Sequence, residues 1–176
     1  MNSPTTAVNG IRIGLASLAL ALLWSWSAPA PALPDDQDKP IQIEADGVEI
    51  DDGRQMSIYS GNVEVQQGSM RLWADQVTVN HQESRQPSRI VATGSPARYR
   101  QLIEKGGNEV KARARRLEYD ASSEELVLIG DAELNQGKDS FKSDRILYDR
   151  AKAVVKGGAS AQGKQRVRIS IDPTGR

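Results

Sequence analysis

Two stretches of this chain match one another at a constant spacing, and that match constrains the fold more than any other feature. Residues 45–80 and 114–149 align without a gap at an offset of 69. Turn residues fall on turn residues, such as Gly61 on Gly130, and apolar positions fall on apolar positions between them. A repeat of both kinds of position indicates one supersecondary unit used more than once. We therefore expect the chain to fold as an array of similar units.

The first 32 residues have the composition of a secretion signal. Arg12 is the one basic residue near the start, and an uncharged run follows from Ile13 to Trp26. Ala30 and Ala32 then place small residues at the two positions that a signal peptidase reads. We predict that residues 1–32 are a cleaved signal peptide, cut near Ala32. An uncleaved signal anchor is the alternative, although the run is shorter than the roughly 18 residues of a membrane span.

The remainder of the chain has the length of one ordinary domain. Its charges nearly balance, because the whole sequence holds 23 Lys and Arg against 23 Asp and Glu. This balance gives no electrostatic reason to expect binding to nucleic acid or to an anionic membrane surface. The acidic, proline-bounded residues 33–40 are predicted to be a disordered lead-in. One domain is expected at 41–171, followed by a tail at 172–176, and the chain has no cysteine for a disulfide.

The domain has the periodicity of β-strands. From Ile41 onward, apolar residues alternate with polar ones, and no stretch carries an apolar stripe at helical spacing. Turn residues such as Gln67-Gly68 and Gly137-Lys138 separate the strands. In each of four predicted hairpins, the first strand ends at an acid or amide that suits a turn, and the second strand ends at a glycine. These positions are Asp51, Asn80, Asp120 and Asp149, and Gly61, Gly94, Gly130 and Gly157.

Changes of parity along the strands predict that the sheet curls over. The apolar residues of the alternating pattern have even numbers near Ile58 but odd numbers from Val63 onward. The pattern changes again, from even to odd residue numbers, at Asp75. Such a change turns later side chains to the other face unless the strand bulges or bends there. We therefore expect two bends in every long strand and an all-β fold, a single antiparallel β-jelly roll built from repeated hairpins as a rolled, twisted sandwich. A parallel β-solenoid is the rival, but closely spaced tight turns favour hairpins.

The sequence offers little for catalysis or metal binding. His81 is the only histidine and is expected on an exposed loop at 80–88, without a nucleophile partner. Asp46, Asp75 and Asp144 recur at equivalent positions, but Arg115 occupies the fourth such position. No loop gathers the six or more oxygens that calcium needs. We expect no enzyme activity, metal or cofactor, and we assign these aspartates to the bends as acceptors for backbone groups.

The interior is the more promising feature. Its expected lining consists mostly of short aliphatic side chains, and large aromatic residues are few. Such a core either closes to ordinary packing density or leaves room for an elongated apolar ligand. The expected lining is Ile43, Val48, Ile50, Ile58, Val63, Val65, Met70, Leu72, Val77, Val79, Leu117, Tyr119, Val127, Ile129, Leu134, Phe141, Ile146 and Tyr148.

Several linked motifs resemble those of one known family. Gly61–Glu64 and Gly130–Glu133 share a G-[ND]-[VA]-E step, and Thr93–Ala97 reads TGSPA. Together with ADGVEIDDGRQMSIYSGNVEV and ARRLEYDASSEELVLIGDAELNQG, they extend over about Ile41–Gln162. This part of the chain resembles the OstA-like family, and within it the soluble members of the lipopolysaccharide transport bridge.

The resemblance implies a fold, a place and a set of partners. The fold would be a β-jelly roll open at both ends, with a groove for lipid A inside, and the mature protein would be periplasmic. Identical copies would stack head to tail. An inner-membrane LptC-like protein would lie at one end and the N-terminal domain of an outer-membrane LptD-like translocon at the other. The alternatives are a membrane-anchored LptC-like relative and a structural envelope protein without a ligand.

Two further expectations concern edges and rims. Residues 166–171 alternate in the manner of an amphipathic strand, with a counterpart at 41–45. Unpaired strands of this kind template addition of another strand, and such a contact can repeat head to tail. The expected stacking edge is Ile41, Ile43, Val167, Ile169 and Ile171. Basic residues such as Arg98, Arg100 and Arg113 are candidates for contact with lipid phosphates at the rim of the groove.

Overall fold

A computed structural model describes residues 39–102, 109–152 and 154–173, which form strands and one short 3-10 helix. The described part of the chain contains no helix with the length and apolarity needed to cross a membrane. The predicted signal peptide, residues 33–38 of the lead-in and residues 174–176 of the tail lie outside the described residues. The elements are β1 (Gln42–Glu44), β2 (Gly47–Asp51), β3 (Met56–Gln67), β4 (Met70–His81), β5 (Pro87–Leu102), β6 (Glu109–Asp120), β7 (Glu125–Gln136), β8 (Asp139–Asp149), β9 (Val154–Gly157), the helix η2 (Gly158–Ala161) and β10 (Arg168–Ser170).

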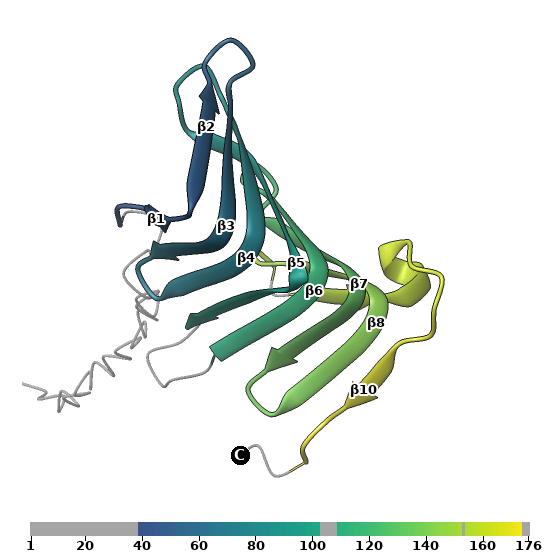
Figure 1. The fold of residues 1–176 in the computed structure, drawn as a ribbon. Helices are drawn as coiled ribbons and strands as arrows, with labels where there is room; N and C mark the ends of the chain where they lie inside the picture. The colour runs from purple at the N-terminus through teal and green to yellow at the C-terminus, as the bar shows by residue number, and fades with distance from the viewer. Residues whose placement is uncertain (1–38, 103–108, 153, 174–176) are drawn as a thin grey trace, which may run out of the picture. The chain divides into compact units, whose positions relative to one another are not determined.

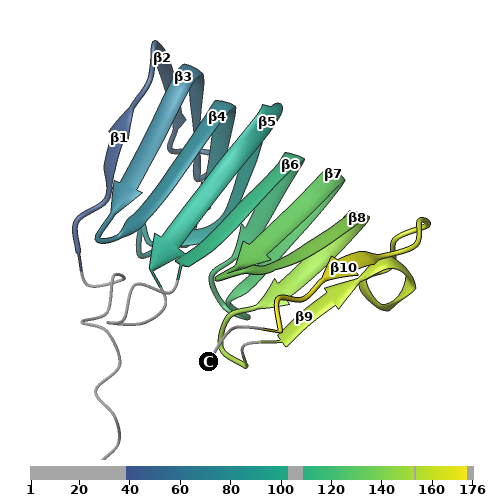
Figure 2. The same cartoon turned by 90° about the horizontal axis from the view of Figure 1, so that it is seen from below.

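The ten strands form one antiparallel sheet (Figures 1 and 2). Their order is β1-β3-β4-β5-β6-β7-β8-β10, with β2 also paired to β3 and β9 also paired to β8. Neighbours in sequence from β3 to β8 are neighbours in space, joined by short turns wherever the connection is described. The predicted hairpin array is therefore confirmed, and the parallel solenoid is excluded.

Acidic side chains close the hairpin turns as predicted. The Oδ1 atom of Asp51 accepts a hydrogen bond from the backbone N–H of Arg54 at 2.9 Å. Asp120 Oδ1 accepts one from Ser122 N–H at 2.9 Å, and Asp149 Oδ1 accepts one from Lys152 N–H at 3.0 Å. Backbone N–H groups in a turn lose the partners that they would have in the strand ladder. An aspartate carboxylate two or three residues earlier accepts hydrogen bonds from them and so stabilises the turn.

One crease crosses the whole sheet and folds it into two layers (Figure 1). Each long strand bends once at the crease, so the expectation of two bends per strand was wrong. The crease runs through Gly61–Asn62 in β3, Asp75 in β4, 94–96 in β5, Arg115 in β6, Gly130–Asp131 in β7 and Asp144 in β8. The first layer consists of β2, β9 and the strand segments 56–60, 76–81, 87–93, 116–120, 125–129 and 145–149. The second layer consists of β1, β10 and 63–67, 70–74, 97–102, 109–114, 132–136 and 139–143.

The neighbouring strands β3 and β4 cross the crease in different ways. In β4 the buried side chains change parity at Asp75, from Leu72 and Ala74 to Val77. In β3 they stay odd, from Ser57 to Val63, because Gly61 and Asn62 oppose a single residue of β4. Both bulge residues have left-handed backbone, with φ of 77° and 45°. A bulge adds one residue to one strand, and the added residue cancels the change of parity.

Small side chains are frequent beside the crease. Four of the interior positions next to it are buried alanines, namely Ala74, Ala97, Ala114 and Ala132, and a fifth is the buried Val63. Larger residues such as Leu128 and Ile146 fill the space farther out, and both are fully buried. Alanine suits the crease because the two layers converge there and leave no room for longer side chains. Full burial of a leucine or isoleucine side chain stabilises the fold by roughly 1.5–3 kcal/mol.

The apolar face of the sheet continues to both of its edges. Val48 pairs with Tyr59 at the β1/β2 edge, and Ile169 pairs with Phe141 at the β9/β10 edge. Paired residues share a face, so Val48 and Ile169 belong to the interior face, yet they are 60% and 55% exposed. Apolar interior positions therefore remain open to solvent at both ends of the roll.

Candidate functional site

The interior between the two layers contains most of the positions expected to line a groove. Leu134 and Ile146 are fully buried, and Ile43, Met70 and Phe141 pack against the core while partly exposed. Val48 and Ile50 face the interior but lie in the edge strand β2. The expected residues that the structure places in the interior are Ile43, Val48, Ile50, Val63, Val65, Met70, Leu72, Val77, Val79, Leu117, Tyr119, Leu134, Phe141, Ile146 and Tyr148.

Three expected interior residues lie on the outer face instead. Ile58 pairs with Thr78 and alternates with the buried Ser57. Val127 and Ile129 alternate with Leu126 and Leu128, which are buried. The interior placement of Ile58, Val127 and Ile129 was wrong because the bulges in β3 and β7 remove the change of parity on which it rested.

A cavity remains inside, near the hairpin tips farthest from the crease. Its volume is about 90 Å³, and its apolar lining includes Ile90 and Ala92 of the first layer and Met70 and Leu72 of the second. The described core residues away from this cavity are buried against one another, so the closed-core alternative describes that part of the interior in this conformation.

Arg150 lines this cavity, and so do the amide side chains of Gln67 and Gln101. Its Nη1 atom donates a hydrogen bond to the Tyr119 hydroxyl at 3.2 Å, and its guanidinium carbon lies 5.5 Å from the centroid of the Tyr119 ring. Burial raises the pKa of the Tyr119 hydroxyl, and the Arg150 charge offsets part of that effect. Burial by itself lowers the pKa of Arg150, but Tyr99, Tyr119 and Glu124 outweigh it and leave that pKa above its ordinary value.

The rim cations expected from the sequence are on the outer surface. Arg98 pairs in register with Trp73 and Arg113, and Arg113 with Glu133, all on the outer face of the second layer. Arg100 forms an ion pair with Glu109 at 2.9 Å. Strict alternation in β5 would have identified Tyr99 and Gln101 as the inward residues, since they lie between these arginines. No local signal marks Arg150, which follows a strand and begins a turn.

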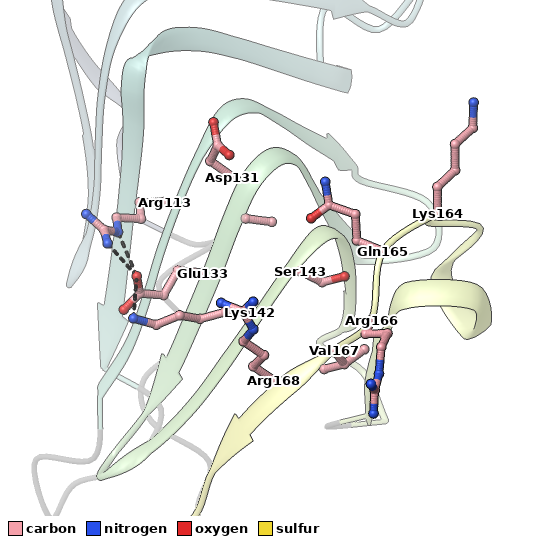
Figure 3. A pocket seen from close by; sticks show the side chains of 11 residues that line it. Arg113, Asp131, Glu133, Lys142, Ser143, Lys164, Gln165, Arg166, Val167 and Arg168 are labelled. Carbon is pink, nitrogen blue, oxygen red and sulfur yellow. Dashed lines mark hydrogen bonds and ion pairs between the residues drawn. The ribbon is translucent and has the colours of Figure 1, made fainter.

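A larger groove of about 850 Å³ lies on the outer face, between the segment 164–168 beside β8 and residues of β6, β7 and β8 (Figure 3). It gathers five cations, and in it Glu133 bridges Arg113 and Lys142 (Figure 3). Burial raises the pKa of Glu133, but hydrogen bonds from Arg113 and Asn135 outweigh it and lower the pKa overall. This outer basic groove is lined mainly by charged and polar side chains, and the core residue Ala132 contributes to its wall. Its cations are Arg113, Lys142, Lys164, Arg166 and Arg168.

The aspartates of the crease accept hydrogen bonds. Asp144 accepts from the backbone N–H groups of Lys164 and Gln165 at 2.7 and 3.1 Å, which fixes the returning segment to the crease. These bonds lower the pKa of the Asp144 carboxyl. Asp46 accepts from the Asn62 side chain at 2.8 Å. Among the described residues, no group of three His, Asp or Glu side chains is placed to hold a metal ion.

His81 is not the exposed loop residue expected from the sequence. It is the last residue of β4 and is half-buried, and the loop spans only 82–86. Its Nε2 atom lies 3.0 Å from the Ser57 hydroxyl. Its Nδ1 atom is buried and has no hydrogen-bond partner within the described part of the chain, so the group that would orient a Ser–His pair is missing there.

The residues expected at the stacking edge divide between two settings. Ile41, Ile169 and Ile171 are exposed, and Ile43 is half-buried in β1. Val167 is not an edge residue, because its methyl groups pack over Gly157 and Gly158 and the strand begins at Arg168. A β-carbon at Gly157 would approach the Val167 side chain to 2.9 Å, which explains the glycine.

Comparison with known proteins identifies relatives over most of the chain. It is 32% identical over 133 residues to the lipopolysaccharide export system protein LptH of Pseudomonas aeruginosa, covering 76% of this chain and 75% of that protein. It is 31% identical over 144 residues to LptA of Haemophilus influenzae, covering 81% and 82%. Against LptA of Escherichia coli K12 the identity is 33% over 114 residues, covering 64% and 61%.

The fold has a counterpart among solved structures. The crystal structure of Pseudomonas aeruginosa LptH, the LptA-homologous periplasmic component of the lipopolysaccharide transport device, matches with a TM-score of 0.72. The match has 29% identity and covers 80% of this chain and 100% of the other. The family model described as LptA/(LptD N-terminal domain) LPS transport protein matches residues 42–154. The chain therefore belongs to the LptA/LptD N-terminal domain family of lipopolysaccharide transport proteins.

Proposed function

We propose that this protein is exported to the periplasm, where it binds lipopolysaccharide and carries it between the inner and outer membranes. The observation that carries the proposal is a two-layer apolar interior, open at both edges, in a chain of the lipopolysaccharide transport family. It would catalyse no bond chemistry. Its work would be to keep acyl chains out of water, at about 0.8 kcal/mol per buried methylene group.

Acyl chains would enter between the two layers at the hairpin tips. The present cavity is too small for them, so loading requires the layers to separate there about the crease. The cross-strand pairings of the described residues join neighbours within one layer, and side-chain packing holds the tips of opposite layers together. Opening the tips therefore exchanges apolar contacts between layers for apolar contacts with lipid and leaves the hydrogen-bonded ladders intact.

Copies would stack head to tail through the two open edges. Val48 and Ile50 at one edge and Ile169 and Ile171 at the other are exposed by 55–69%. A contact between unlike edges repeats without closing and joins the apolar interiors into one path. The same edges would meet an LptC-like protein at the inner membrane and the N-terminal domain of an LptD-like translocon at the outer membrane.

Site-specific photocrosslinking tests the lipid path. A photoreactive residue is placed at Ile90 or Met70, which line the cavity, and at Val127 or Ile58, which face outward. We expect ultraviolet light to attach lipopolysaccharide at Ile90 and Met70 and to leave the outward positions unlabelled. Labelling of Val127 and Ile58 with none at the cavity would refute an interior path.

A further inference from the structure

The interior cavity has a single charged residue in its lining. Ten of the eleven residues around it are apolar, aromatic or amide side chains, and the eleventh is Arg150. An apolar ligand alone gives no reason to place a guanidinium in such a setting, because moving a charge out of water is unfavourable unless it meets a partner.

The contacts of Arg150 hold it in place without neutralising it. Its backbone N–H donates to the Glu124 carbonyl oxygen at 3.1 Å, which fixes the start of the β8–β9 turn. Its side chain donates to the Tyr119 hydroxyl and lies over the Tyr119 ring. These groups orient the guanidinium, and they are neutral. Its pKa lies above the ordinary value, so it is charged at neutral pH.

Arg150 also differs from the arginines of the outer face. Arg113 forms an ion pair with Glu133, and Arg100 forms one with Glu109. Among the described residues, no carboxylate oxygen lies within 4.0 Å of the Arg150 guanidinium, and Glu124 acts on it from a greater distance. A half-buried arginine without a carboxylate partner is ready for an anion from outside the chain.

We propose that Arg150 is the anion-recognition residue of the interior site and binds a phosphate group of the lipid whose acyl chains enter between the layers. This inference rests on the proposed function and adds the residue that would bind the phosphate of the lipid headgroup. The planar fork of arginine matches the oxygens of a phosphate and binds it through two parallel hydrogen bonds. Gln67 and Gln101 also line the cavity, and Met70 and Leu72 belong to its apolar wall.

The outer basic groove does not serve the same purpose. It holds more cations, but Glu133 already bridges two of them, Arg113 and Lys142, which belong to the outer face of the second layer. An anion there would be separated from any acyl chain between the layers. Arg166 of that groove is therefore a suitable control, because it is exposed and remote from the cavity.

The test compares two lipids on the full mature protein. Native mass spectrometry titrations measure the Kd of phosphorylated lipid A and of the same lipid with its phosphates removed. We expect wild type to favour the phosphorylated lipid by about tenfold or more, because a hydrogen bond to a charged group contributes on that scale. Arg150→Gln should bring the ratio of the two Kd values close to one. Arg150→Lys should keep part of the preference, and Arg166→Gln should keep all of it.

Circular dichroism and the Tm establish that each variant is folded. An unchanged ratio in Arg150→Gln overturns the inference, and so does an equal loss of affinity for both lipids, since that would mark a packing role. Displacement of the phosphorylated lipid by equimolar inorganic phosphate would identify a site for free phosphate and also overturn it. If wild type binds neither lipid, the proposed function itself fails; if it binds both and Arg150→Gln keeps the ratio, only this inference fails.

Discussion

Glycine at the crease decides which side chains of two strands face the interior. Gly61 and Gly130 have φ of 77° and 79°, in the left-handed region that other residues rarely adopt. Each also lies against a side chain of a neighbouring segment. A β-carbon at Gly61 would overlap Asp46 Oδ2 and approach Asp46 Cβ to 2.9 Å; Asp46 lies between β1 and β2. At Gly130 it would meet Arg115 Nε at 2.5 Å.

The two glycines allow backbone strain to be separated from steric overlap. We expect Gly61→Ala and Gly130→Ala each to lower the free energy of unfolding by about 1–3 kcal/mol through the left-handed backbone. Gly61→Ala should cost more, because the Asp46 β-carbon is fixed while the end of the exposed Arg115 side chain can move. Urea unfolding measures both. Equal losses, or a larger loss for Gly130→Ala, would contradict this account.

At the scale of the element, the long strands cross the crease in three ways, and β5 alone does so with three residues, 94–96. The strands β4, β6 and β8 cross the crease at a single residue and change parity there. The strands β3 and β7 cross it with a two-residue bulge and keep their parity. Each copy of the repeat contains one bulged strand and one strand that changes parity: β3 and β4 in residues 45–80, and β7 and β8 in residues 114–149. This shared arrangement explains why the two copies match without a gap.

Paired substitutions in β7 test the face assignment directly. Leu128 is fully buried, whereas its neighbour Val127 lies on the outer face. Leu128→Ala should lower the free energy of unfolding by about 2–5 kcal/mol, because it leaves a cavity in the core. Val127→Ala should cost less than about 1 kcal/mol. Chemical denaturation compares the two, and the reverse order would restore the parity that the sequence alone predicted.

At the scale of the folded sheet, the two unlike edges are the main feature. The inner faces of the two layers pack against each other. At the β1/β2 and β9/β10 edges, no further strand among the described residues covers the apolar face. Exposed apolar residues at a strand edge favour association, since pairing buries them and extends the ladder. The two edges differ in sequence, so an asymmetric contact is the expected one.

Mixing two edge variants tests that asymmetry. Val48→Asp places a charge in the apolar contact surface of the β1/β2 edge, and Ile169→Asp does the same at the β9/β10 edge. Both positions are exposed, so each variant should stay folded. Each alone should lose the oligomers of wild type in sedimentation velocity. Mixed in equal amounts, they should form dimers and nothing larger, because one intact edge remains on each. A mixture that stays monomeric, or a single variant that still forms long oligomers, would exclude a head-to-tail contact.

Local patterns in the sequence determined the strands, their hairpin order and the turn chemistry. Alternation is a property of neighbouring residues, and Asp51, Asp120 and Asp149 bind backbone groups only a few residues away. In β4 and β8, which change parity at the crease, the pattern along the strand was sufficient because the bulge lies in the partner strand, so Leu72, Val77 and Ile146 were placed correctly in the interior.

Only the tertiary structure decided what depends on register between strands. Gly61 and Asn62 either reverse the face of the following side chains or form a bulge, depending on how many residues of the partner strand lie opposite them. Bulges form in β3 and β7, and therefore Ile58 and Val127 lie on the outer face. The alanines of the crease reflect the distance between two layers, which no strand determines alone. Arg150 reaches the cavity because its turn packs against the β6–β7 hairpin, a contact between segments that are not adjacent in sequence.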